Sequence, residues 1–288
     1  TAGLELQAGH RANARVAYRR ISSARVRELM PPRPRAAHKG DFGHVLVIGG
    51  GAGMPGAAQM CGEAALRAGA GRVSVATHPE HAAYMFVDRP ELMAHAINSV
   101  KDLDQLLEKA DVIAFGPGLG RSEWAGELFT RAAKDRRPAV WDADALNWLA
   151  EVPARAANRV ITPHPGEAAT LLGLAAGQVQ ADRPAALEQL HERYGGVVVL
   201  KGAGSLISSE TGAPWLSTAG NPGMATAGMG DVLTGVIAGL LAQGLGIEDA
   251  AALGVAVHAE AGDRAAAGGE RGLLATDLSA EIRSIVNP

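Results

Sequence analysis

NPGMATAGMGDVLTGVIAGLLAQG, residues 221–244, sets two glycines and an aspartate directly before a long apolar run. Gly228 and Gly230 precede Asp231, which opens a helix predicted over residues 231–243. Free N–H groups at a helix N-terminus flanked by glycines form an anion site. A carboxylate in that turn either caps the helix or accepts the proton of a hydroxyl that attacks a bound phosphoryl group. The residues alone leave both interpretations open.

Around this stretch, short apolar runs alternate with helical segments. The expected strands are residues 45–48, 72–76, 111–115, 139–141, 159–161 and 197–200. The expected helices are residues 57–68, 123–134, 165–172, 231–243 and 248–267, and residues 205–208 and 214–218 resemble a hairpin. Strands that alternate with helices predict an α/β fold with a mostly parallel sheet covered on both faces.

Two glycine loops directly follow expected strands: GGGAGMPG, residues 49–56, and GPGLG, residues 116–120. The first satisfies G-x-G-x-x-G, but a dinucleotide-binding fingerprint also requires an acid at the end of the second strand, and residues 76–78 hold none. Pro55 also stands where the helix should open. Either loop is explained structurally as a tight turn. We interpret them as a place where one elongated ligand approaches the backbone beyond the carboxyl ends of the strands.

The motif WDADALN, residues 141–147, places Asp142 and Asp144 after a strand. Such acids hold Mg²⁺ through water, or Asp144 caps a helix, and the two interpretations are equally good. In TPHPGE, residues 162–167, the charge of Glu167 is favoured by the dipole of the helix that follows. His164 lies between two prolines on a stiff loop, which favours a contact with ligand.

KGAGS, residues 201–205, follows the most β-branched strand. Lys201 is able to reach a phosphate, and Gly202 and Gly204 permit close backbone approach. The order G-x-x-x-x-G-K-[ST] is absent, so this is not a P-loop.

Composition excludes several function classes. The 288 residues suffice for one large α/β domain, and the net charge of -3 argues against nucleic-acid binding. Residues 1–40 nevertheless hold nine Arg and Lys against two acids, which predicts a solvated basic arm or linker over residues 1–38 before a domain over residues 39–288. Cys61 is the one cysteine, which excludes an intrachain disulfide and fits a reducing compartment. No apolar run approaches the ~20 residues that cross a bilayer.

Together with GDFGHVLVIGG (residues 40–50) and PGAA (residues 55–58), these motifs resemble the NAD(P)H-hydrate dehydratase family of the ribokinase-like superfamily. The resemblance covers residues 39–286, with every motif in order. It implies a ribokinase-like three-layer αβα sandwich with a mostly parallel central sheet. It also implies a carbon–oxygen lyase that uses ADP or ATP to dehydrate the S epimer of NAD(P)H hydrate, with Mg²⁺ as cofactor. NAD(P)H is restored, and AMP or ADP is released with phosphate.

The resemblance also implies roles for residues. Asp231 is expected to be the catalytic base, and the amides around Gly228 and Gly230 to stabilise the transferred phosphoryl group. The expected nucleotide-binding residues are Lys201, Gly202, Ala203, Gly204, Ser205 and Gly230. The expected contacts of the hydrate are Ala57, Gly118, Gly120, His164 and Asp231. Glu167 is expected to orient Mg²⁺ through water. Met229 stands where Ser or Thr is more usual, with little effect expected because the backbone amide acts there.

The expected partners are the substrates NADHX and NADPHX, with no nucleic acid and no membrane. A cytoplasmic homo-oligomer, often a tetramer in such proteins, is expected. The family often occurs fused behind an epimerase domain, and the basic arm together with Thr1 in place of Met fits a processed chain or a piece of such a fusion. ADP against ATP, NADH against NADPH hydrate, and any K⁺ requirement stay open.

Three other functions compete with this interpretation. A ribokinase-like small-molecule kinase, acting on a vitamin precursor or sugar, would share Asp231 but release a stable phosphorylated product. A non-catalytic nucleotide sensor would not need the Gly230–Asp231 pair. An NAD-dependent dehydrogenase would need the acid that is missing at residues 76–78.

Overall fold

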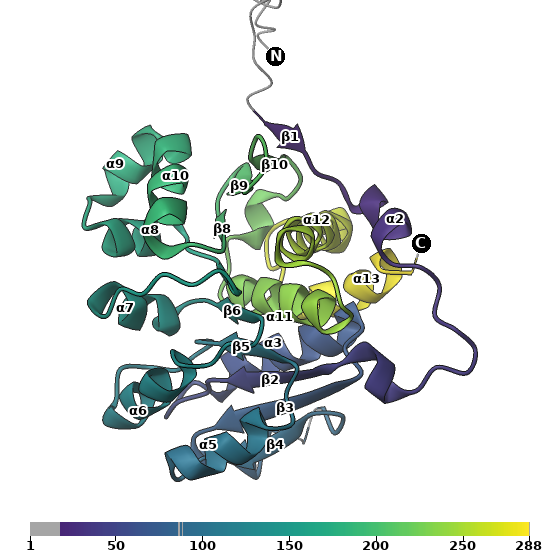
Figure 1. Cartoon of the computed structure of the whole chain (residues 1–288). Coiled ribbons are helices and arrows are strands. Elements are labelled where there is room, and N and C mark those ends of the chain that lie inside the picture. Colours follow the sequence, from purple (N-terminus) through teal and green to yellow (C-terminus); the bar gives the residue numbers. More distant parts are fainter. Residues whose placement is uncertain (1–17, 86, 88, 288) are drawn as a thin grey trace, which may run out of the picture.

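The structure, a computed structural model, describes residues 18–85, 87 and 89–287. In this part of the chain one ten-stranded sheet runs in the order β1-β10-β9-β8-β7-β6-β5-β2-β3-β4 (Figure 1). The strands are β1 (Arg19–Arg20), β2 (His44–Ile48), β3 (Arg72–Thr77), β4 (Met93–Ala96), β5 (Val112–Phe115), β6 (Ala139–Trp141), β7 (Arg159–Ile161), β8 (Val197–Leu200), β9 (Ser205–Ile207) and β10 (Trp215–Ser217). From β8 to β4 every neighbouring pair is parallel, while β9 is antiparallel to both β8 and β10.

Helices cover both faces of the sheet, which confirms the predicted αβα layers (Figure 1). One layer holds α3 (Pro55–Ala68), α11 (Met229–Ala242), α12 (Ile247–Ala265) and α13 (Leu278–Ile285). The other holds α5 (Val100–Leu107), α6 (Glu123–Ala132), α7 (Asp144–Glu151), α8 (Pro165–Leu172), α9 (Ala176–Ala181) and α10 (Arg183–Tyr194). The short helices α2 (Val26–Leu29) and α4 (Pro79–Ala82) and single 3₁₀ turns at Ser23–Arg25, Lys39–Phe42, Pro222–Met224, Ala266–Gly268 and Ala275–Asp277 complete the described elements.

Strand β2 shows why the sheet is buried on both sides. Its residues are apolar almost throughout, and successive side chains of a strand point to opposite faces. Val45 and Val47 accordingly pack into the core beneath α3 and α11, and Leu46 and Ile48 into the core beneath α5 and α6. A run without polar alternation is the pattern expected of a central parallel strand.

Helices α3 and α11 pack with their backbones unusually close. A Cβ on Gly235 would overlap the carbonyl oxygen of Cys61, and a Cβ on Gly239 would lie 2.6 Å from that of Ala65. Glycines on one helix and small residues on the other therefore let the two axes approach. This contact fixes where the N-terminus of α11 emerges at the edge of the sheet.

The described part of the predicted arm is not a solvated extension. Strand β1 pairs in parallel with β10, and Ile21 and Val26 are almost fully buried. Arg19 forms an ion pair with Glu248 of α12 at 2.8 Å and lies over the ring of Trp215. The basic residues thus find partners on the domain that the charge pattern alone did not show. Residues 1–17 lie outside the described residues, and the boundary at residue 38 stays a prediction.

No helix in the described part of the chain is long and apolar enough to cross a membrane.

Candidate active site

The predicted motifs converge at one edge of the sheet because the strands before them are parallel. Strands β2, β3, β5, β6, β7 and β8 all end there, and each is followed by a loop that sequence analysis or the structure singles out. The two glycine loops are hydrogen-bonded to each other, since Gly50 N–H donates to Pro117 O at 2.9 Å and Gly51 N–H to Gly118 O at 2.6 Å. This edge is where open parallel sheets bind their ligands.

Helix α11 begins at the same edge. Gly228 is its N-cap residue with φ 91°, and no side chain of the described residues caps it. A Cβ on Gly228 would lie 2.6 Å from the Cε of Met60, and a Cβ on Gly230 would lie 3.2 Å from both the Asp142 carboxylate and the Lys201 ammonium. The first turn therefore presents bare backbone beside a charged pair, as a phosphoryl-binding turn requires.

The charged pair is buried beneath this turn. Lys201 Nζ lies 2.7 Å from Asp142 Oδ1, and the Thr234 hydroxyl donates to Asp142 Oδ2 at 2.9 Å. Burial alone would raise the pKa of Asp142, but Lys201 and the hydroxyl donors bring it below its ordinary value. Burial would lower the pKa of Lys201, but Asp142 and Glu167 raise it. Both groups are thus charged at neutral pH.

Asp231, in the first turn of α11, has the ionisation expected of a base. Burial and the negative charge of Asp142 raise its pKa to about 7, with Asp144 and Glu167 adding to the effect and Lys201 opposing it. A general base works best when its pKa lies near the operating pH. The N-cap position belongs to Gly228, so helix capping does not account for Asp231.

His164 and Glu167 form a capping box at the start of α8. His164 N–H donates to Glu167 Oε2 at 2.8 Å, and His164 Nδ1 accepts from Gly166 N–H at 3.0 Å. Glu167 also lies 3.6 Å from Lys201 Nζ, and burial with the neighbouring Asp142 raises its pKa. The capping box therefore accounts for Nδ1 of the His164 ring, while Nε2 lies 3.5 Å from Glu167 Oε1 and the side chain as a whole is exposed.

Asp144 binds the backbone of the second glycine loop, a role that neither of the predicted alternatives, a Mg²⁺ ligand or a helix cap, included. Its Oδ2 accepts from Gly120 N–H at 2.8 Å, so it holds the second glycine loop in place. Ala143, and not Asp144, is the N-cap residue of α7, and its φ of 50° makes it the one non-glycine residue with positive φ in the described part of the chain. Strained backbone of this kind concentrates at functional sites.

The structure places the predicted hydrate contacts Ala57 and Gly118 side by side. A Cβ on Gly118, whose φ is 59°, would lie 3.0 Å from the Cβ of Ala57. Gly120 follows at the end of the same loop. His164 lies on the β7–α8 loop at the same edge of the sheet.

The loop of residues 201–205 carries the predicted nucleotide contacts Lys201, Gly202, Ala203, Gly204 and Ser205 after β8. Arg183 of α10 braces this loop, donating to the carbonyls of Leu200 at 3.0 Å and Ala203 at 2.9 Å. Its guanidinium also lies against Gly202. Sequence analysis missed Arg183, because nothing in the polar segment around it indicates a contact with a loop 18 residues away.

The sequence that forms this site also matches a known family. The sequence profile described as NAD(P)H-hydrate dehydratase matches residues 45–284. The chain belongs to this family. A bifunctional NAD(P)H-hydrate repair enzyme of Coxiella burnetii is 54% identical over 261 residues, which cover 90% of this chain and 54% of the relative. An ADP-dependent (S)-NAD(P)H-hydrate dehydratase of Neisseria meningitidis is 36% identical, with 92% of both chains covered.

A solved structure of the family confirms the predicted ribokinase-like fold. The ADP/ATP-dependent NAD(P)H-hydrate dehydratase of Bacillus subtilis, co-crystallised with ATP and Mg²⁺, is 30% identical, with a TM-score of 0.83 over 92% of this chain and 96% of that chain. This dehydratase-family chain spans about half the length of the bifunctional relatives from Coxiella burnetii and Escherichia coli.

Proposed function

We propose that this NAD(P)H-hydrate dehydratase family member uses ADP or ATP to dehydrate the S epimers of NADHX and NADPHX. The names of the relatives support the substrate and the phosphoryl donor. The observation that carries the proposal is the position of Asp231: a half-buried carboxyl with a pKa of about 7 in the glycine-flanked first turn of α11. A kinase-type step needs this pairing of a base with an anion-binding turn.

In the first step Asp231 accepts the proton of the hydroxyl that hydration added to the nicotinamide ring. The hydroxyl oxygen then bonds to the terminal phosphorus of the nucleotide, and the bond from that phosphorus to the bridging oxygen breaks, releasing AMP or ADP. The amides near Gly228 and Gly230 would hold the transferred charge, because donors preorganised at the start of a helix stabilise it without rearrangement. In the second step the ring C–O bond breaks, phosphate leaves and loss of a ring proton restores the double bond.

Two sets of loops would hold the two nucleotides. The loop of residues 201–205, braced by Arg183, would bind the phosphoryl donor through its backbone, with Lys201 beside the phosphates. The glycine loops would hold the hydrate through Ala57, Gly118 and Gly120, with His164 as a side-chain contact. Keeping the two ligands on neighbouring loops brings the hydroxyl and the phosphoryl group together without a large movement of the chain.

The charge balance of the site fits a divalent cation. The negative charges of Asp142, Asp144 and Glu167 all raise the pKa of Asp231, and the Lys201 ammonium opposes them. Carboxylate oxygens are the donors that Mg²⁺ prefers, usually with water between. Glu167 would hold Mg²⁺ through water, and the ion would neutralise charge on the phosphates. A tetramer, a cytoplasmic location and an epimerase partner stay predictions that rest on the resemblance.

The test is absorbance at 340 nm after the protein is mixed with NADHX or NADPHX, Mg²⁺ and either ADP or ATP. A rise that depends on the nucleotide would establish the dehydratase and identify its donor. Consumption of the nucleotide with a stable phosphorylated product and no rise at 340 nm would instead support the small-molecule kinase, which shares Asp231 and the anion-binding turn.

A further inference from the structure

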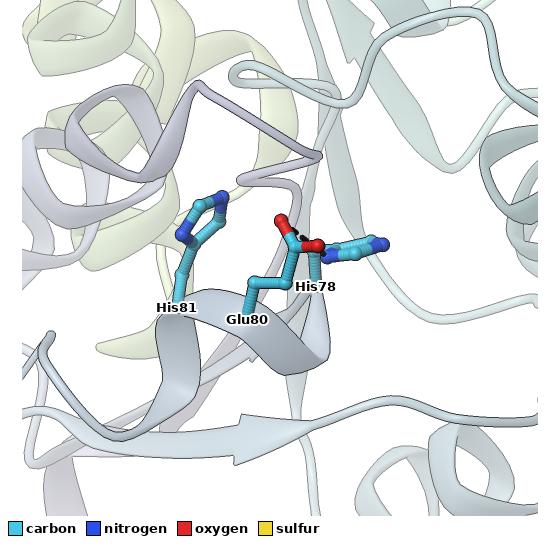
Figure 2. Close-up of side chains that lie close together, drawn as sticks. All are labelled: His78, Glu80 and His81. Atoms are coloured by element: carbon cyan, nitrogen blue, oxygen red, sulfur yellow. Dashed lines mark ion pairs between the residues drawn. The ribbon is translucent and has the colours of Figure 1, made fainter.

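Three side chains gather beside the first glycine loop without a role in the proposed reaction. His78 follows the end of β3, and Glu80 and His81 lie in α4, so all three stand at the carboxyl edge of the sheet. One ligand atom from each lies within 4.8 Å of the others. Figure 2 shows the Glu80 carboxylate between the two imidazole rings.

The donor set suits a borderline transition-metal dication. Two imidazoles and one carboxylate are typical ligands of Zn²⁺, which binds each at about 2.0–2.2 Å. A tetrahedral ion needs donor atoms about 3.4 Å apart, so donors that lie up to 4.8 Å apart must approach by up to about 1.4 Å. Glu80 is exposed, so its carboxylate can move toward the two rings without displacing packed side chains.

His78 supports this assignment independently. Its Nδ1 is buried and finds no hydrogen-bond partner within the described residues, while Glu80 Oε2 lies 3.8 Å away. The ring packs edge-on against Trp124 at 5.4 Å between centroids, which limits its rotation. A buried nitrogen without a partner is costly unless something binds it.

His81 connects the cluster to the glycine loop. Its Nε2 accepts a hydrogen bond from Gly53 N–H at 3.1 Å. A neutral imidazole has one nitrogen lone pair to offer and carries its proton on the other nitrogen. While Nε2 accepts from Gly53, Nδ1 therefore holds the proton, and the ring has no lone pair left for a metal. Binding of a metal by His81 and the hydrogen bond to Gly53 exclude each other.

We propose that His78, Glu80 and His81 form a site for a Zn²⁺-type dication, and that occupation of this site releases Gly53 from His81. Gly53 belongs to the loop that donates to Gly118 through Gly51 and leads into α3, where Ala57 lies. Metal binding would thereby loosen one of the two loops assigned to the hydrate. This last consequence, weaker hydrate binding, rests on the proposed function; the metal site and its competition with Gly53 do not.

The first experiment measures Zn²⁺ binding to the full chain by titration calorimetry, with Co²⁺ absorption as a report of the ligand geometry. Glu80→Gln and His78→Gln should each weaken binding by at least about tenfold, because each loses a ligand. Glu91→Gln, at another exposed acid, should not change it. Equal binding by the wild type and both ligand variants would overturn the proposal.

The second experiment follows amide hydrogen exchange of the peptide that contains Gly53. Zn²⁺ should increase the exchange rate of this peptide in the wild type but not in Glu80→Gln. An unchanged exchange rate in the wild type with Zn²⁺ bound would contradict the competition between the metal and Gly53. In the 340 nm assay, Zn²⁺ should raise the KM for the hydrate several-fold more in the wild type than in Glu80→Gln. Because ADP binds the same amount of Zn²⁺ in both assays, this chelation does not affect the comparison between the two proteins. If the chain showed no dehydratase activity, the calorimetry and exchange would still test the site.

Discussion

At the scale of single residues, the site is organised by the buried ion pair of Lys201 and Asp142 and by the neighbouring carboxyl of Asp231. Lys201 is bound to Asp142 at 2.7 Å, so its charge only partly compensates Asp231. As a result, the pKa of Asp142 lies below its ordinary value while that of Asp231 lies above it. This separation of the two pKa values supports the proposed role of Asp231 as the base, with Asp142 as a structural anion.

The raised pKa of Asp231 predicts the pH dependence of the reaction. The base acts in its ionised form, so kcat/KM should fall about tenfold per pH unit below pH 7 and level off above it. A profile recorded from pH 5.5 to 9 in the 340 nm assay checks this. Constant kcat/KM between pH 5.5 and 7 would show that Asp231 does not titrate as the base.

Removing Lys201 should destabilise the fold. Lys201→Met leaves Asp142, which is 1% exposed, without its counter-charge, and an uncompensated buried charge costs about 3–5 kcal/mol. The double variant Lys201→Met/Asp142→Asn should regain part of that loss. Urea unfolding measures both, and a double variant less stable than the single one would mean that the pair does not act as described.

At the scale of elements, the position of the α11 N-terminus depends on the glycine-mediated contact with α3. Gly235 and Gly239 face the backbone of α3, and Gly228 faces Met60 on the same helix. The glycines of this helix therefore serve two purposes, close packing along its length and bare amides at its start.

Gly235→Ala should lower the stability by about 1–3 kcal/mol through overpacking, because the new Cβ overlaps the Cys61 carbonyl oxygen, which cannot rotate away. The matched control is Gly177→Ala in α9, where nothing lies within 4 Å, and where alanine should be neutral or stabilising by up to about 1 kcal/mol. Thermal unfolding distinguishes the two. A neutral Gly235→Ala would mean that α3 and α11 are not in tight contact.

Many of the strands and helices were predictable from the sequence. The strands before each glycine or acidic loop were predicted within one or two residues, because apolar runs that end in glycines or acids are a strong local pattern. Strand β4 was not predicted, since MAHA at the sheet edge has no apolar run, and α5, α7, α9, α10 and α13 were also missed. Arg183 and His81 act on loops distant in sequence, and such contacts have no local signature.

At the scale of the whole molecule, the N-terminal segment belongs to the folded unit that carries the site. Residues 19–30 add β1 to the sheet and bury Ile21 and Val26. The charge excess of this region had predicted a solvated arm, because local charge counts do not show that Arg19 and Arg25 pair with Glu248 and Asp249 of α12.

A chain that begins at residue 39 should therefore be less stable than one that begins at residue 18. Loss of the burial of Ile21 and Val26 alone removes about 1.5–3 kcal/mol for each side chain. Denaturant unfolding of the two chains measures the difference. Equal stability would show that the segment contributes nothing to the domain.

The most direct test of the proposed catalytic role is the effect of Asp231→Asn on turnover and on ADP binding, measured on the same preparation. We expect turnover to fall by about 10²–10⁴-fold, with the Kd for ADP within several-fold of the wild type. The variant should also be more stable than the wild type above pH 7. A carboxyl whose folded pKa is raised destabilises the fold as pH rises toward that pKa, and asparagine does not ionise. Turnover near the wild-type level, or equal losses of turnover and ADP affinity, would contradict the role of Asp231 as the base.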